Sequence, residues 1–304
     1  MPSDLVLVTG AGGNLGAALT PELRQRGYRV RLLDLRPLDL AGGVDATVGD
    51  VRRPDDVRQA MEGARWVVHG AAWHGIHLEG HPRRDFWELN VDGTFNVYEA
   101  AIDAGVDGIV LASTMGVYGD SDTPQPGNPA VRVHEGLPLK PVDIYGLSKV
   151  VCEQLAQLWV RTEKVRTIAL RFGMFVPETF PRYGVRLLYG GVDPRDVAAS
   201  VVASILALER EATWFDAFNI ESAVPFSSED ASLLPRDPMT VIARHWPEAP
   251  GLLAAAGADL WGEIKRYYDI THAAEALGWR PQFNFEQFLE ALASKEGRAP
   301  TSGA

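Results

Sequence analysis

A short apolar run followed by a glycine-rich turn constrains the fold of this chain more than any other feature. Residues 5–10 read LVLVTG, which is typical of a buried strand, and the turn GAGGNLG leads into an amphipathic segment, residues 14–27. Gly10, Gly13 and Gly16 are three residues apart. In such a turn the first glycine permits a tight bend, the second lets backbone approach a pyrophosphate, and the third lets helix and strand pack closely. The pattern predicts a strand–turn–helix unit that binds an anion at the helix N-terminus.

The same alternation of strand-like and helix-like segments continues along the chain. The predicted strands are residues 5–10, 28–35, 45–51, 65–72, 108–114 and 165–172, and the predicted helices are residues 14–27, 54–63, 85–105 and 143–163. Strands separated by helices form parallel sheets that carry helices on both faces. The sequence therefore predicts an α/β fold, a Rossmann-type doubly wound parallel sheet.

An acidic residue at the end of the second predicted strand bears on the choice of dinucleotide. Asp34 follows Gly16 by eighteen residues, where a carboxylate can bind the hydroxyls of the adenosine ribose. That charge repels a 2′-phosphate, so NAD is expected rather than NADP, although Arg36 weakens the preference slightly. Asp50 and Val51 close the third strand and are expected to frame the adenine. The expected NAD contacts in the glycine-rich turn are Gly10, Gly13, Asn14, Leu15 and Gly16.

The pattern changes after residue 173. Residues 194–211 predict a helix, residues 215–220 predict a strand that joins the sheet, and the proline- and glycine-rich stretch 120–141 is interpreted as a loop. The C-terminal third is expected to form a small cap that binds substrate. The expected domains are an NAD-binding Rossmann domain at residues 1–172, mainly a substrate-binding cap at residues 173–296, and a disordered tail at residues 297–304.

Composition excludes several classes of partner. The 304 residues carry a formal net charge of −11, which disfavours nucleic acid and anionic membrane surfaces. Cys152 is the single cysteine, so no internal disulfide and no cysteine-rich metal site is expected. No apolar run reaches the ~18 residues of a membrane helix, and no basic-then-apolar leader precedes the first strand. We therefore expect a cytoplasmic protein whose partners include neither nucleic acid nor membrane.

Residues 144–151 read IYGLSKVV and place Tyr145 four positions before Lys149. Four residues is about one helical turn, so both side chains would lie on one helix face. An ammonium beside a phenol favours the phenolate, which could make Tyr145 a proton-transfer group near neutral pH. A surface tyrosine above a surface lysine is the alternative that the spacing alone leaves open.

In their order along the chain, these motifs resemble the extended short-chain dehydrogenase/reductase family, also called the NAD-dependent epimerase/dehydratase family. The resemblance covers most of the chain. The matching segments are TGAGGNLG at 9–16, Asp34, GDV at 49–51, HGAA at 69–72, NVDGT at 90–94, STMGVYG at 113–119, YGLSK at 145–149, FNI at 218–220 and LGWRP at 277–281.

The resemblance implies a role for several of these residues. Tyr145 would be the catalytic acid/base, Lys149 the group that lowers its pKa and bonds the nicotinamide ribose, and Thr114 the hydroxyl that orients the substrate. Ser113 is adjacent to Thr114 and stays an alternative. Asn90 matches the asparagine that supports the active-site helix. The further cofactor contacts that the resemblance implies are Ala71, Ala72, Asn90, Tyr145 and Lys149.

The resemblance also implies a substrate smaller than a nucleotide sugar. Nucleotide-sugar members carry an asparagine where this chain has Met174, and a long nucleotide-clamping insert where it has only residues 175–195. Smaller uronate dehydrogenases share the shortening, and Arg186 matches the arginine that they place on a substrate carboxylate, a pairing through two parallel hydrogen bonds. A solvated loop arginine is the alternative. Met115 and Gly116 replace the Asn and His with which those enzymes touch a sugar acid, so a different sugar or a small alcohol stays open.

The segment WHGIHLEGHPRRDFW, residues 73–87, is unusually rich in histidine. His74, His77 and His81 follow the fourth predicted strand, at the carboxyl end of the sheet where ligands bind. We expect His74 and His77 to contact substrate, and Trp73 to wall the nicotinamide pocket. Their spacing matches no metal motif, so no metal is expected.

Together these features predict an NAD-dependent oxidoreductase that transfers hydride between NAD and a hydroxyl or carbonyl of a small sugar, sugar acid or polyol-like substrate. The alternatives are a nucleotide-sugar epimerase or dehydratase, and a non-catalytic NAD-binding regulatory protein, against which Tyr145 argues because binding alone does not need it. Predicted helices 85–105 and 143–163 carry apolar side chains on more than one face. Related enzymes pair these helices with a partner's copies, so a homodimer is expected.

Overall fold

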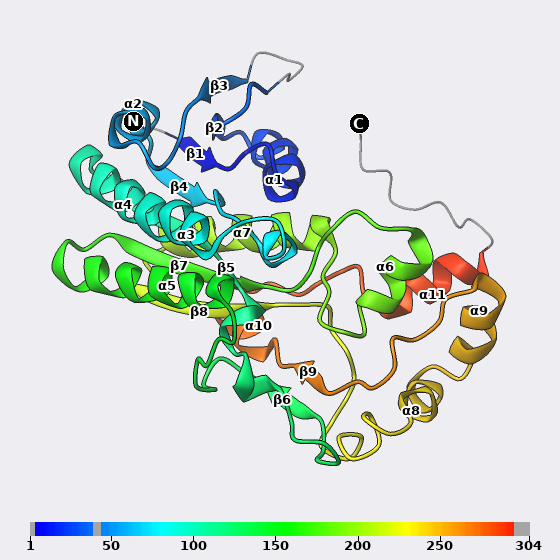
Figure 1. Ribbon diagram of the computed structural model, residues 1–304. Coiled ribbons are helices and arrows are strands. Elements are labelled where there is room, and N and C mark those ends of the chain that lie inside the picture. The colour runs from blue at the N-terminus through cyan, green and yellow to red at the C-terminus, as the bar shows by residue number, and fades with distance from the viewer. Residues whose placement is uncertain (1–3, 39–43, 295–304) are drawn as a thin grey trace. The chain divides into compact units, whose positions relative to one another are not determined.

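The computed structural model describes residues 4–38 and 44–294, and the predicted tail at residues 297–304 lies outside them. Seven strands form one sheet in the order β3-β2-β1-β4-β5-β7-β8 (Figure 1). Pairing is parallel between neighbours from β3 to β5. The strands are β1 (Leu5–Thr9), β2 (Arg29–Asp34), β3 (Asp45–Val48), β4 (Trp66–His69), β5 (Gly108–Thr114), β7 (Arg166–Phe172) and β8 (Phe215–Ile220). This architecture confirms the predicted Rossmann-type α/β fold.

The strand order reverses between β1 and β4, and this reversal places the ligand site. The chain winds from β1 outward to β3, then returns to the other side of β1 with β4. Thr9 and His69 are paired at the carboxyl ends of these two neighbouring strands. In doubly wound sheets ligands bind in the crevice outside the carboxyl ends of the strands where the order reverses.

Helices α2, α4 and α5 pack side by side over one face of the sheet (Figure 1). Their apolar side chains share one buried core with residues of β1, β4, β5 and β7, because each helix presents a 3.6-residue apolar stripe to the strands. The helices that flank the sheet are α1 (Asn14–Gln25), α2 (Pro54–Met61), α4 (Gly93–Ala104), α5 (Ile144–Thr162) and α7 (Pro194–Glu209).

The helix predicted at residues 85–105 is three segments rather than one. A short helix α3 (Arg83–Phe86) leads into a π-helical segment (Trp87–Asp92), and α4 follows. A π-turn accommodates an extra residue in a helix and is frequent at functional sites. The apolar periodicity of the sequence does not reveal the extra residue, because the pattern on either side stays helical.

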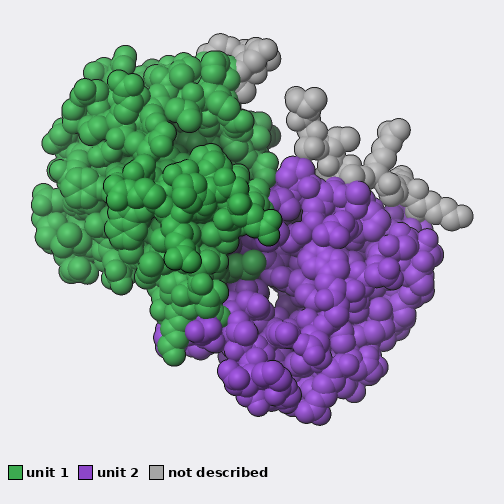
Figure 2. Space-filling view, in the orientation of Figure 1, with its two compact units in different colours: residues 1–119, 139–171, 197–218 green, residues 120–138, 172–196, 219–304 purple. Residues whose placement is uncertain are grey.

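The chain divides into two compact units, which Figure 2 colours green and purple. Unit 1 comprises residues 1–119, 139–171 and 197–218, and unit 2 comprises residues 120–138, 172–196 and 219–304. The predicted loop 120–141 therefore contributes most of its length to unit 2.

Unit 2 has its own small sheet and its own core. Strands β6 (Val131–Val133) and β9 (Arg266–Tyr268) pair in parallel. The loop interpretation of residues 120–141 was wrong at β6, because a three-residue strand is too short to show an alternating pattern. The helices that enclose this core are α6 (Phe180–Arg186), α8 (Pro238–His245), α9 (Ala249–Ala256) and α11 (Phe285–Ala293), and α10 (Thr271–Ala276) follows β9.

Among residues 4–38 and 44–294, no helix combines the length and the apolar character that crossing a membrane requires.

Candidate active site

The glycine-rich turn between β1 and α1 leaves room for backbone only. Gly10 has φ of +67°, and a Cβ there would lie 2.6 Å from the backbone of Ala71. A Cβ on Gly16 would lie 2.1 Å from the carbonyl oxygen of Ala11. Gly13 caps α1, whose first turn contains no acidic residue. The turn therefore fits a pyrophosphate approached by backbone N–H groups at a helix N-terminus.

Asp34 is fixed at the carboxyl end of β2. Its Oδ2 accepts a hydrogen bond from the Gly12 N–H at 2.8 Å, and its Oδ1 accepts one from the Arg36 N–H at 3.0 Å. The side chain is only 9% exposed, whereas the Arg36 guanidinium, 3.7 Å away, is 73% exposed. A held carboxylate beside the phosphate turn fits an adenosine ribose, and it disfavours a 2′-phosphate.

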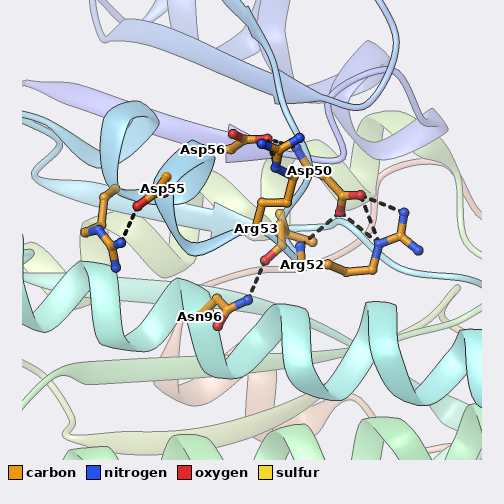
Figure 3. A network of polar contacts seen from close by, with 8 residues as sticks. Asp50, Arg52, Arg53, Asp55, Asp56 and Asn96 are labelled. Atoms are coloured by element: carbon orange, nitrogen blue, oxygen red, sulfur yellow. Dashed lines mark hydrogen bonds and ion pairs between the residues drawn. The ribbon is translucent and has the colours of Figure 1, made fainter.

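The end of β3 is fixed by a polar network (Figure 3). The Asp50 N–H donates to Asp56 at 2.9 Å, and the Asp50 carboxylate accepts three hydrogen bonds from the Arg52 guanidinium at 2.6–3.0 Å. Asn96 on α4 donates to the Val51 carbonyl at 3.0 Å. Burial raises the pKa of Asp50, but the Arg52 hydrogen bonds outweigh it and hold that pKa below its ordinary value. The backbone at residues 50 and 51 is therefore fixed in place, and the Asp50 carboxylate is already paired with Arg52.

A buried histidine holds the segment that follows β4. His69 contacts the Thr9 hydroxyl through Nδ1 at 2.7 Å and the Thr94 hydroxyl through Nε2 at 3.0 Å. Thr9 Oγ1 also accepts from the Ala71 N–H at 3.3 Å. Desolvation, with the nearby Lys149 charge, lowers the pKa of His69 to about 3, so the ring is neutral. The network fixes the backbone at Ala71, where the cofactor was expected to pass.

Two adjacent hydroxyls at the end of β5 have different partners. Ser113 is buried and donates to Glu153 Oε1 at 2.6 Å. Thr114 accepts from the Gly116 N–H at 3.1 Å and shares a hydrogen bond with Tyr145. The geometry thus favours Thr114 over Ser113 as the hydroxyl that acts with Tyr145.

Tyr145 and Lys149 lie one turn apart near the start of α5. The Lys149 ammonium is buried and donates to the Ala112 carbonyl at 2.8 Å. Desolvation by the surrounding protein raises the pKa of Tyr145 to about 12. The hydrogen bond with Thr114 offsets part of this increase. In this structure Lys149 is not among the groups that shift the pKa of Tyr145. The expected lowering of the Tyr145 pKa by Lys149 therefore stays a prediction for the enzyme with NAD bound.

Asn90, in the π-helical segment, joins the histidine-rich loop to α5. Its side-chain oxygen accepts from the Trp73 N–H at 2.8 Å, and its amide donates to the Trp73 carbonyl at 3.0 Å and to Ser148 Oγ at 2.9 Å. Ser148 in turn donates to the Tyr145 carbonyl at 2.7 Å. Sequence reasoning missed Ser148, although it lies within the quoted YGLSK segment.

The histidine-rich loop lies over Tyr145. The His74 ring is 6.1 Å from the Tyr145 ring, and the His74 N–H donates to His77 Nδ1 at 3.0 Å. Trp73 stacks on His81 at 3.9 Å and meets His77 edge-on at 4.9 Å. Desolvation of the ring and then the Lys149 charge lower the pKa of His74, so the ring is neutral. Across the described parts of the chain, no three His, Cys, Asp or Glu side chains are grouped to hold a metal ion.

Arg186 belongs to unit 2, where an internal carboxylate occupies it. Its Nε and Nη2 donate to the two oxygens of Glu178, both at 2.5 Å, and its Nη1 lies 2.6 Å from the Met174 sulfur. The guanidinium also lies over the Trp261 ring at 4.8 Å. Hydrogen bonding from Arg186 lowers the pKa of Glu178 and keeps it ionised. The edge of Arg186 that would clamp a ligand carboxylate is therefore already filled.

The fold and the site together define a dinucleotide-dependent enzyme with a tyrosine and a lysine one helical turn apart. Comparison with known sequences places it more closely: the chain belongs to the NAD dependent epimerase/dehydratase family, whose sequence profile matches residues 6–188. This confirms the family resemblance, and NAD is the cofactor.

Three relatives show how far the similarity extends. The chain is 28% identical to the L-arabinose 1-dehydrogenase (NAD(P)(+)) of Haloferax volcanii, over 94% of this chain and 99% of that protein. It is 29% identical to the uronate dehydrogenase of Pseudomonas syringae pv. tomato, over 78% and 89% respectively. A short-chain dehydrogenase/reductase superfamily protein of Agrobacterium tumefaciens, solved with bound NAD, shares the fold with a TM-score of 0.72 at 22% identity, over 96% of this chain and 97% of that one.

Proposed function

We propose that this enzyme oxidises a hydroxyl of a small free sugar or polyol-like compound with NAD, and that Thr114, Tyr145 and Lys149 carry the reaction. The observation that carries the proposal is the Thr114–Tyr145 hydrogen bond beside the buried Lys149 ammonium, in the same unit as the phosphate turn. A protein that only binds dinucleotide has no use for this hydroxyl pair.

Each residue of the proposed site has a separate task. Bound NAD supplies the hydride acceptor. Thr114 hydrogen-bonds the substrate hydroxyl and orients it toward Tyr145. The Tyr145 phenolate takes the hydroxyl proton as the carbon loses its hydride, and the phenol returns that proton in the reverse direction. The Lys149 ammonium stabilises the phenolate by its charge. Asn90 and Ser148 fix the start of α5, so that the Tyr145 phenol keeps its position relative to Thr114.

The surroundings of Arg186 favour an uncharged substrate over a sugar acid. A carboxylate that binds Arg186 must displace Glu178, which already accepts two charge-assisted hydrogen bonds from it, and both side chains are largely buried. Only α6 and short connections lie between Met174 and α7, which supports a substrate without a nucleotide. The chain is similar both to an L-arabinose dehydrogenase and to a uronate dehydrogenase, so the choice between the two substrate classes rests on the surroundings of Arg186.

His74 and His77 complete the proposed site. A neutral imidazole beside the Tyr145 ring can exchange hydrogen bonds with a neighbouring hydroxyl of the substrate without attracting a carboxylate. His77 accepts from the His74 N–H, and so it fixes the loop on which His74 is carried. We propose that His74 contacts the substrate directly and that His77 contacts it at the edge of the site.

The test of the proposed function is NAD reduction measured with matched substrates. D-galactose and D-galacturonate differ only at C6, and UDP-galactose adds the nucleotide; L-arabinose and a set of polyols complete the panel. We expect turnover with the free neutral sugars, weak turnover with the uronate and none with UDP-galactose. Glu178→Gln, which keeps the size of the side chain and removes its charge, is expected to improve uronate oxidation about tenfold, equivalent to 1.4 kcal/mol. Absence of turnover with every free sugar and polyol would end the proposal.

We also propose that the enzyme is a cytoplasmic homodimer built on α4 and α5. Phe95 on α4 and Leu158 on α5 are exposed by 46% and 45%, and Leu147 is exposed by 42%. Phe95 also meets the Trp159 ring at 5.4 Å, so these side chains belong to one helix pair. Exposed apolar side chains gathered on two adjacent helices are typical of an interface between copies.

Replacing Phe95 by Glu is expected to convert the dimer to a monomer, because it buries a charge in an apolar interface. Light scattering at micromolar concentration measures the mass. Val48→Glu is the matched control, because Val48 is 58% exposed on β3, away from both helices. A wild-type protein that is monomeric at this concentration contradicts the proposal.

A further inference from the structure

A buried ion pair lies behind the candidate catalytic residues, and no step of the proposed reaction uses it. Glu153 and Arg171 are 1% and 5% exposed. Arg171 donates to both oxygens of Glu153, from Nε at 3.0 Å and from Nη2 at 2.7 Å. Ser113 donates to the same carboxylate at 2.6 Å, and Arg171 also donates to the Tyr118 hydroxyl at 3.0 Å. The carboxylate is thus fixed by three hydrogen bonds.

These contacts tie together every element that carries a catalytic side chain. Ser113 precedes Thr114 on β5, Glu153 follows Lys149 by one turn of α5, and Tyr118 directly follows the short 3-10 turn Met115–Val117. Arg171 comes from the next strand, β7. A buried ion pair contributes little net stability relative to apolar residues of the same size. The position of the pair therefore calls for an explanation other than stability.

The electrostatic surroundings of Lys149 suggest a role for the Glu153–Arg171 ion pair. The titratable and charged groups around it are His69 on β4, His74 in the histidine-rich loop, Tyr145, Cys152 and Glu153 on α5, and Arg171 behind Glu153. The two histidines are neutral because desolvation lowers their pKa, and Cys152 is a neutral thiol because burial raises its pKa. Cys152 and then Glu153 favour an ammonium on Lys149, and of these two Glu153 is the one that carries a carboxylate.

We propose that Glu153 is a positioning residue that keeps Lys149 protonated and holds the end of β5, with Ser113 and Arg171 fixing its carboxylate. Burial lowers the pKa of Lys149 below its ordinary value. Glu153, one turn away, opposes that lowering and favours the ammonium. Through Ser113, the same carboxylate fixes the backbone from which Thr114 reaches Tyr145. The inference rests on the proposed roles of Lys149 and Tyr145.

The test compares E153D, which keeps the charge, with E153Q, which removes it. The pH dependence of kcat and of kcat/KM is measured with the neutral sugar that the wild-type enzyme oxidises, and NAD affinity is measured over the same pH range by quenching of protein fluorescence. For E153Q we expect the alkaline limit of activity, and that of NAD affinity, to move down by about one pH unit, the size of a single charge effect. E153D is expected to keep both limits and to lose only part of kcat.

Two further variants separate positioning from folding. E153Q removes the carboxylate that pairs with the buried Arg171 guanidinium, so the double variant E153Q/R171Q, which is neutral and can still form hydrogen bonds, is measured beside it. Because the double variant also removes the positive charge of Arg171, its downward shift is expected to be smaller than that of E153Q. Ser113→Ala removes one hydrogen bond and no charge; it should lower kcat several-fold with a wild-type pH profile. A wild-type alkaline limit in E153Q, or a wild-type kcat in Ser113→Ala, would overturn the proposal. If no sugar is oxidised, the proposed function fails, while the NAD titrations still decide the role of Glu153.

Discussion

Tyr145→Phe is expected to lower kcat by about 10²–10⁴-fold, the usual contribution of a positioned acid/base group, and to leave NAD affinity nearly unchanged. The substitution keeps the aromatic ring that packs beside His74 and Gly75, and it removes only the hydroxyl that bonds Thr114. Steady-state NAD reduction with the preferred sugar measures kcat, and fluorescence quenching measures NAD binding.

Tyr98→Phe is the matched control for this experiment. The Tyr98 hydroxyl is fully buried under α5 and contacts Thr167 at 3.0 Å. Its removal is expected to cost about 1 kcal/mol of stability and to leave kcat unchanged. Near-normal turnover in Tyr145→Phe would show that the YGLSK helix has no acid/base role.

The pH profile of the wild-type enzyme tests the same assignment. Oxidation requires the Tyr145 phenolate, and burial raises the pKa of this phenol to about 12 in the cofactor-free enzyme. We therefore expect oxidation to accelerate as pH rises. In Tyr145→Phe this rise should disappear, because the group that titrates is gone.

The sequence was most informative where chemistry depends on local spacing. Three glycines at intervals of three, and a tyrosine one turn before a lysine, can be interpreted without knowing what lies elsewhere, because the strand–turn–helix and the helical turn place those residues by themselves. The carboxylate of Asp34 was also placed correctly at the end of β2, since strand ends can be found from apolar runs.

What the sequence did not show depends on contacts between distant segments. Glu178 pairs with Arg186, and Ser113 donates to Glu153, across intervals that no periodicity describes. The same holds for β6, whose partner β9 lies more than a hundred residues later. The segment around Arg186 is compatible with a substrate clamp and with a solvated loop arginine, and its pairing with Glu178 is visible only in three dimensions.

Gly10→Ala is expected to be the most damaging single-methyl change in the phosphate turn. The new Cβ would lie 2.6 Å from the Ala71 backbone and 2.8 Å from that of Gly70. Because these atoms are backbone held by the Thr9–His69 network, they cannot move aside as a side chain would. We expect a loss of about 1–3 kcal/mol from this collision, added to about 1–2 kcal/mol for a left-handed alanine, and at least a hundredfold weaker NAD binding.

Gly27→Ala separates the two costs. Gly27 follows α1 with φ of +87°, and a Cβ there would meet nothing within 4 Å. This variant therefore carries only the backbone strain, and it should bind NAD normally with a modest decrease in the free energy of unfolding. Denaturant unfolding and NAD titration of both variants give the comparison. Equal losses in the two proteins would mean that strain alone matters, and that the close approach of Gly10 to Ala71 does not shape the cofactor site. A large excess loss in Gly10→Ala would instead show that the carboxyl ends of β1 and β4 must meet through backbone for the dinucleotide to bind.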